Sequence, residues 1–174
     1  MNSIGPIIAA TGLHGVRYAE RLLTGIAPSQ FARLARNGDA PVQSNHPAFV
    51  YGHLSLYPAK VMAALGLPVG RAAPPAGYEA LFAKDVACRD DVAGTLYPPM
   101  AEVTVFVAES YRFALEVVQA TDDAVFNRPV PPDDRRRANF PTVGSSVNYF
   151  FGGHLFMHLG QVSAWRRMKG LPPA

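Results

Sequence analysis

The stretch that decides the fold is VNYFFGGHLFMHLGQVSAW, residues 147–165. Six positions, apolar but for two histidines and one glutamine, recur in steps of 4, 3, 4, 3 and 4 residues, namely Val147, Phe151, His154, His158, Gln161 and Trp165. This spacing follows one face of an α-helix and is typical of a helix that faces the core of a bundle. We therefore predict a helix over residues 145–169, with its basic end at Arg166 and Arg167 before the stop at Gly170.

Two histidines on this face are one helical turn apart. Residues four positions apart have Cβ atoms about 6 Å from each other, so His154 and His158 would both point into the core. A buried imidazole nitrogen without a partner costs about 1–3 kcal/mol. A divalent metal ion would remove this cost for both rings, because each neutral imidazole can donate a lone pair to it. Histidines that only form hydrogen bonds in the core are the alternative interpretation.

Three further segments show helical periodicity: residues 7–23, 47–65 and 99–120. Pro47 suits the first turn of the second segment and Gly66 suits its stop. On the third, the expected core-facing side chains are Val103, Phe106, Val107, Ser110, Phe113, Ala114 and Val117. Gly12 and Gly15 weaken the first segment, since each glycine costs roughly 1 kcal/mol relative to alanine.

The segments between these helices are unequal in length. Residues 67–98 and 121–142 form two long, proline-rich connections, the first with room for a short helix at residues 78–85. Long connections in a compact domain are often functional, or cross between parallel neighbours. We therefore predict an all-α fold, a four-helix bundle with two long connections, in a single domain over residues 1–174.

Composition limits the class of protein. The chain has 174 residues, of which 49% are hydrophobic and 17% charged, with a net charge of +3, so we expect a folded domain. Its single cysteine, Cys88, excludes an intramolecular disulfide framework and a cysteine-rich zinc module. The Arg135–Arg137 run is not interleaved with aromatic residues, so no nucleic-acid partner is expected. We see neither a secretory signal nor a membrane span, and expect a soluble, cytoplasmic protein.

A third histidine, His53 on the predicted second helix, could bind the same metal ion as His154 and His158. On the second helix, His53 falls on the same stripe as Tyr57, and a ligand on a facing helix is what a bundle site requires. Three neutral histidines form an open site that leaves room for water or substrate. We therefore predict that His53, His154 and His158 bind a metal ion.

Other residues are candidates for supporting roles. His46 precedes Pro47 at the mouth of the predicted site, where capping or loop packing is favoured over ligation or proton transfer. Tyr57 could line the cavity or be a core aromatic residue, and Gln161 could orient a substrate or pack below the metal. His14 has no spaced partner and is expected to pack. Glutamates recur every seven residues on the third helix, at Glu102, Glu109 and Glu116. Such a spacing usually marks a solvated face, although one of them could turn inward toward an imidazole N–H.

Two motifs carry a family resemblance. They are NHPAFVYGHL at residues 45–54 and HLFMHLGQ at residues 154–161, the latter followed by Trp165-Arg166-Arg167 and Gly170-Leu171-Pro172. With these motifs and its helix order, nearly the whole chain resembles the DinB superfamily of metal-binding four-helix bundles, which includes YfiT-like hydrolases and bacillithiol transferases.

The resemblance implies His53, His154 and His158 as ligands of a divalent ion such as nickel or zinc, and a homodimer. It also implies a small-molecule substrate and either hydrolysis or transfer of a low-molecular-weight thiol, which would be a second cofactor. A metal in an open site lowers the pKa of a bound water or thiol, which suits both reactions. The alternatives are a non-catalytic metal-binding protein, of the stress-response or ligand-binding kind, and a bundle whose histidines have only structural roles.

Overall fold

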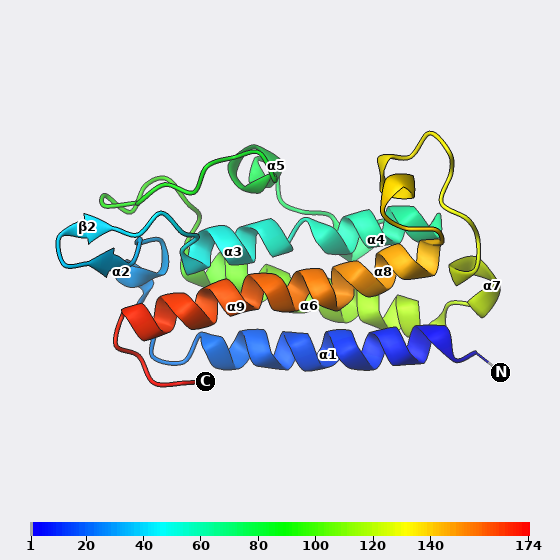
Figure 1. Ribbon diagram of the computed structural model, residues 1–174, viewed down its shortest axis with the longest axis horizontal. Helices are drawn as coiled ribbons and strands as arrows, with labels where there is room; N and C mark the ends of the chain where they lie inside the picture. The colour runs from blue at the N-terminus through cyan, green and yellow to red at the C-terminus, as the bar shows by residue number, and fades with distance from the viewer. Residues whose placement is uncertain (1) are drawn as a thin grey trace.

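The computed structural model describes residues 2–174 and is mostly helical, which confirms the predicted all-α class (Figure 1). Its α-helices are α1 (Ile4–Leu22), α2 (Pro28–Phe31), α3 (Pro47–Leu54), α4 (Tyr57–Leu65), α5 (Tyr78–Phe82), α6 (Met100–Ala120), α7 (Asp123–Phe126), α8 (Val143–Phe151) and α9 (Gly153–Met168). Two 3-10 helices, η1 (Gly70–Ala72) and η2 (Arg135–Ala138), and a two-stranded antiparallel sheet, β1 (Arg36–Asn37) with β2 (Ala40–Pro41), complete the fold.

The long helices lie side by side along the long axis of the molecule. α3 continues into α4 and α8 into α9, and these two composite rods run beside α1 and α6 (Figure 1). α1 contacts α6, α8 and α9, while α3 contacts α6 and α9. One continuous hydrophobic core fills the space between them. Within residues 2–174, no helix combines the length and the apolar character needed to cross a membrane.

The predicted helix over residues 47–65 is broken into α3 and α4 by a turn at Ser55 and Leu56. Pro58 accounts for the break, because proline has no N–H to donate and its ring clashes with the carbonyl four residues earlier, here that of Leu54. The predicted stop is confirmed, since Gly66 closes α4 with a left-handed φ of 77°.

The predicted helix over residues 145–169 is also divided. α8 begins earlier, after Thr142, whose side chain accepts a hydrogen bond from the backbone N–H of Ser145. Gly152 separates α8 from α9 with φ −114° and ψ −95°, which lies outside the helical region. The core-facing stripe nevertheless continues across the break, since Phe151 and His154 are both buried.

The face that α6 buries is rotated from the predicted one. Tyr111, Leu115 and Val118 are buried there, whereas three predicted core positions are only half-buried, at Phe106, Phe113 and Val117. Phe113 is covered by a charged side chain instead, because the Arg71 guanidinium lies 4.6 Å from its ring centroid. A charged cover of this kind keeps an aromatic ring near the surface although its spacing is that of a core residue.

Two helical glycines lie where neighbouring elements approach closely. A Cβ on Gly15 would lie 2.4 Å from a methyl carbon of Leu155, so this glycine allows α1 to pack tightly on α9. A Cβ on Gly52 would lie 2.3–2.5 Å from three ring atoms of Phe82, at the contact between α3 and α5. Gly15, predicted from sequence only to weaken its helix, is therefore needed for packing.

We predict that Gly52→Ala lowers the free energy of unfolding by about 1–3 kcal/mol, because the added methyl overlaps the buried Phe82 ring. Gly160→Ala in α9 is the matched control, since a Cβ there meets nothing within 4 Å. This substitution should raise the free energy of unfolding by up to about 1 kcal/mol, because alanine favours the helix over glycine. Urea denaturation measures both. Equal effects of the two substitutions would contradict this account of α5 packing.

Candidate metal centre

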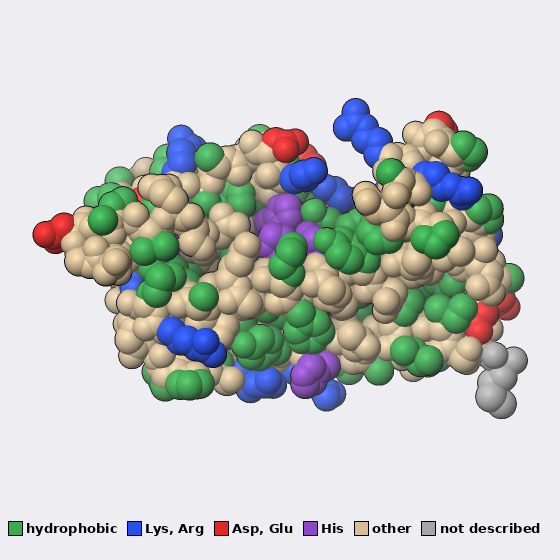
Figure 2. Space-filling model, in the orientation of Figure 1, with side chains coloured by type: hydrophobic (Ala, Val, Ile, Leu, Met, Phe, Trp, Pro, Cys, Tyr) green, Lys and Arg blue, Asp and Glu red, His purple; other side chains and the backbone are tan. Residues whose placement is uncertain are grey.

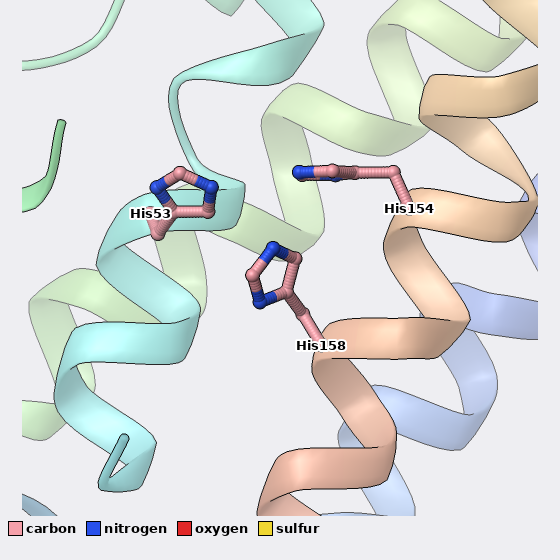
Figure 3. Close-up of side chains that lie close together, drawn as sticks. All are labelled: His53, His154 and His158. Carbon is pink, nitrogen blue, oxygen red and sulfur yellow. The ribbon is translucent and has the colours of Figure 1, made fainter. Parts of the chain in front are cut away.

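Three histidines from two helices meet at one point of the fold. His53 comes from α3, and His154 and His158 come from α9 (Figure 3). Their ring centroids are 4.5–5.4 Å apart, and one nitrogen from each ring can be chosen so that all three lie within 4.8 Å of one another. The three histidines therefore lie close enough to bind a metal ion.

The ring of His53 is held by the backbone of α5. Its Nδ1 lies 2.8 Å from the carbonyl oxygen of Phe82. A carbonyl can only accept, so Nδ1 carries the proton and donates it, and the neutral ring keeps its lone pair on Nε2. A hydrogen bond of this kind fixes both the orientation and the tautomer of a metal-binding histidine.

The ring of His158 is held by a side-chain amide one turn further along α9. Its Nδ1 lies 3.1 Å from Oε1 of Gln161, and the same oxygen accepts a hydrogen bond from Nδ2 of Asn45, also at 3.1 Å. With Oε1 as the acceptor, Nδ1 of His158 donates and Nε2 keeps the lone pair. The structure thus places Gln161 behind His158, whose ring it orients.

His154 is the most deeply buried of the three. The residue is 5% exposed, and its Nδ1 is buried without a hydrogen-bond partner among the residues that the structure describes. Burial, together with the neighbouring His158 and His53, lowers the pKa of His154 to about 3. Burial also lowers the pKa values of His53 and His158, although the hydrogen bonds that these rings donate to Phe82 and Gln161 act in the opposite direction. All three rings are thus neutral at neutral pH.

Tyr57 lies directly against the histidines, as the sequence stripe allowed. Its ring centroid is 4.0 Å from that of His154 and 5.0 Å from that of His53. Burial raises the pKa of its phenol to about 12, so the hydroxyl keeps its proton at neutral pH. Because α4 begins at Tyr57, the turn that follows α3 carries this side chain over the site.

His46 lies outside the histidine cluster, and both of its ring nitrogens are occupied. Nδ1 accepts the backbone N–H of Phe49 at the start of α3, and Nε2 donates to the carbonyl of Arg89 at 2.9 Å. The ring is fully buried and packs edge-on against Tyr97. No lone pair is left for a metal, so the structure gives His46 the capping role and places it away from the cavity lining.

The remaining sequence candidates are also elsewhere. His14 is exposed on α1, and burial raises the pKa of the Cys88 thiol to about 11. Among the three glutamates, Glu102 accepts a hydrogen bond from Tyr78 at 3.0 Å and Glu116 lies 4.0 Å from Arg71. None of the described carboxylates or thiols belongs to the cluster, so its three potential donors are all imidazoles.

A cavity of about 420 Å³ opens beside the histidines, within the range typical of small-molecule sites. In the space-filling view the histidines are visible in a hollow flanked by hydrophobic and basic side chains (Figure 2). Besides the histidines, its lining contains Phe49, Tyr57, Tyr149, Phe150, Met157, Asn45 and Lys84. Sequence reasoning missed Lys84 and Asn45 because both come from irregular segments, where no periodicity marks an inward-facing side chain.

The donor set suits a divalent transition metal. Neutral imidazole nitrogens are common ligands of zinc and nickel, and three of them leave positions open for other ligands. Two nitrogens on one zinc ion are at most about 4 Å apart, so small rotations of the rings would bring the set to bonding distance. The buried, unpartnered Nδ1 of His154 is consistent with this interpretation.

Comparisons with protein-family models, with curated proteins and with solved structures give no match for this chain. The resemblance to the DinB superfamily therefore depends on the two sequence motifs, and the site is interpreted from its own geometry.

We predict that the metal-free protein loses stability as the pH falls from about 6.5 toward 3, and that His154 contributes to this loss. Above pH 6.5 this ring is neutral in both states, whereas below it the unfolded chain binds a proton that the native ring, with its pKa near 3, does not. His154→Gln should therefore reduce the loss between pH 7.5 and 5.5 by about 1 kcal/mol.

Urea denaturation of chelator-treated protein at the two pH values measures this difference. His14→Gln, at an exposed position outside the cluster, is the control and should keep the wild-type loss. An unchanged loss in His154→Gln would show that this ring is not held neutral by burial.

Proposed function

We propose that the protein is a metal-dependent enzyme of the DinB superfamily. In this proposal His53, His154 and His158 hold one divalent ion, zinc or nickel, and a small-molecule substrate binds in the adjoining cavity. The observation that carries the proposal is the convergence of three neutral imidazoles, with nitrogens within 4.8 Å of one another, beside a cavity of about 420 Å³.

The hydrogen bonds around the rings favour metal binding over a purely structural role. Phe82 and Gln161 take up Nδ1 of His53 and of His158, which leaves both Nε2 lone pairs free for a ligand. A structural histidine pair would instead use its nitrogens on protein partners, as His46 does with both of its own. A metal ion is the partner that satisfies several lone pairs at once.

The fold supports the family assignment in outline. α1, α6 and the composite rods α3–α4 and α8–α9 lie side by side, as the four helices of a DinB-type bundle would (Figure 1). The resemblance also implies a homodimer and a cytoplasmic location, and both belong to the proposal. Sedimentation velocity tests the dimer, and a monomer at all concentrations would contradict that part.

The bound ion would supply a Lewis acid that lowers the pKa of a water or thiol coordinated to it. The chain itself orients the ligands and shapes the space. The Phe82 carbonyl and the Gln161 amide hold two of the rings, while Tyr57 covers His154 and limits its access to water. The aromatic side chains of the cavity offer an apolar surface to a substrate.

Two reactions are compatible with this arrangement, hydrolysis and transfer of a low-molecular-weight thiol. For thiol transfer, the nucleophile would have to come from a bound cofactor, since Cys88 is outside the cluster and its pKa is raised. Metal-loaded protein assayed with ester and amide substrates, and with a thiol plus an electrophile, separates the two. Full metal occupancy without turnover in either assay would instead favour the non-catalytic alternative.

We predict that His154→Ala and His158→Ala each lose the bound metal, because two imidazoles hold zinc or nickel far less tightly than three. Elemental analysis after dialysis against the ion measures occupancy, and circular dichroism verifies that helicity is retained. His14→Ala is the control and should bind one equivalent. If both variants bound as much metal as the wild type, the ligand assignment would be wrong.

We also predict that Gln161→Leu weakens metal binding by roughly 10–100-fold, because the His158 ring loses the partner that fixes its orientation and tautomer. Competition with a chromophoric chelator measures the affinity. Gln119→Leu, at an exposed position on α6, should leave it unchanged. An affinity for Gln161→Leu equal to that of Gln119→Leu would remove Gln161 from the site.

A further inference from the structure

We infer that the cavity beside the histidines binds an anionic substrate with a planar apolar body, such as an aryl carboxylate, whose acid group is held by Lys84. This inference rests on the proposed function and adds a substrate class to it. It draws on three features of the cavity: an unpaired cation in its lining, a second cation at its rim, and an aromatic wall.

The charge of the cavity favours an anion. Lys84 follows α5 and lines the cavity, and it forms no ion pair with any residue in the described part of the chain. The lining as described contains no carboxylate. A negatively charged group bound against this lining would face the positive charge of Lys84 and no carboxylate of the lining.

A second cation lies at the rim. The Lys60 ammonium is 5.1 Å from the centroid of the Tyr57 ring, which itself lines the cavity. Its partner Glu79 is 3.4 Å away, and the two side chains are 45% and 63% exposed, so the pair is weak and exchangeable. Basic side chains are visible beside the histidines in this hollow (Figure 2). An incoming anion can therefore draw on Lys60 as well as Lys84.

The wall on the α4–α8 side is aromatic. The ring of Phe150 lies 5.2 Å from Tyr57 and 5.5 Å from Tyr149, and Phe140 extends the group at 6.0 Å. Rings at these distances offer stacking and edge contacts to another planar group. Met157, 52% exposed in the same lining, adds a flexible apolar side chain. A small, fully polar anion would leave this surface unused.

A cationic substrate fits the same surroundings less well. Aromatic rings can bind a cation over their faces, but the face of Tyr57 is already occupied by the Lys60 ammonium. A cationic substrate in the cavity would also be repelled by Lys84. The combination of an aromatic wall with free lysine charge thus selects a planar acid over a planar amine.

The test compares phenylacetate, its neutral isostere phenylacetamide and acetate, titrated into metal-free and zinc-loaded protein and followed by protein NMR. We expect phenylacetate to bind roughly tenfold more tightly than either of the others, in the metal-free protein as well. Lys84→Gln should reduce the preference for phenylacetate over the amide to about twofold. Lys169→Gln, outside the cavity lining, should leave it unchanged.

Equal affinities for phenylacetate and phenylacetamide, or a preference untouched by Lys84→Gln, would overturn the inference. If acetate bound as tightly as phenylacetate, the claim that the aromatic wall contributes to substrate binding would be wrong. Titration of the metal-free protein distinguishes this inference from the proposed metal site. If the protein binds no zinc but still prefers phenylacetate through Lys84, the metal proposal fails and this inference holds.

Discussion

The hydrogen bond from Nδ1 of His53 to the carbonyl of Phe82 is the contact on which the rest of the site depends. It joins α3 to α5, sets the tautomer of the ring and leaves Nε2 directed to the space shared with α9. Gly52 makes it possible, because any side chain there would push the Phe82 ring away from α3. Gly52, the residue next to His53, thus determines whether α5 can approach α3 closely enough to hold the His53 ring.

Burial and charge act together around this contact. Desolvation keeps all three rings neutral, so they can donate lone pairs without first losing a proton. No carboxylate belongs to the histidine cluster or to the cavity lining as described, and Lys84 in that lining forms no ion pair with any residue of the described chain. In the function that we propose, the imidazoles would hold a cation and Lys84 an anion beside it, as a metal-dependent enzyme acting on an acid would require.

The sequence predicted most of the histidine cluster, because the positions of His154 and His158 follow from the local spacing of a helix. Its interpretation of two helices as continuous was wrong, although Pro58 and the Gly152–Gly153 pair mark the breaks. The site residues that could not be predicted from the sequence lie in the segments that connect the main helices. The Phe82 carbonyl, Asn45 and Lys84 reach the site through tertiary packing, and Arg166 is buried against backbone carbonyls at the end of α1, including that of Leu22. No periodicity records contacts of this kind.

X-ray absorption spectroscopy of the zinc- or nickel-loaded protein tests the central claim most directly. The account predicts an ion coordinated by three imidazole nitrogens, at about 2.0–2.1 Å for zinc, with the remaining positions taken by light atoms from solvent. A sulfur scatterer near about 2.3 Å would place a cysteine or methionine side chain at the metal, either Cys88 or Met157 of the lining, and contradict the account. So would an ion with fewer than three imidazoles in its coordination shell.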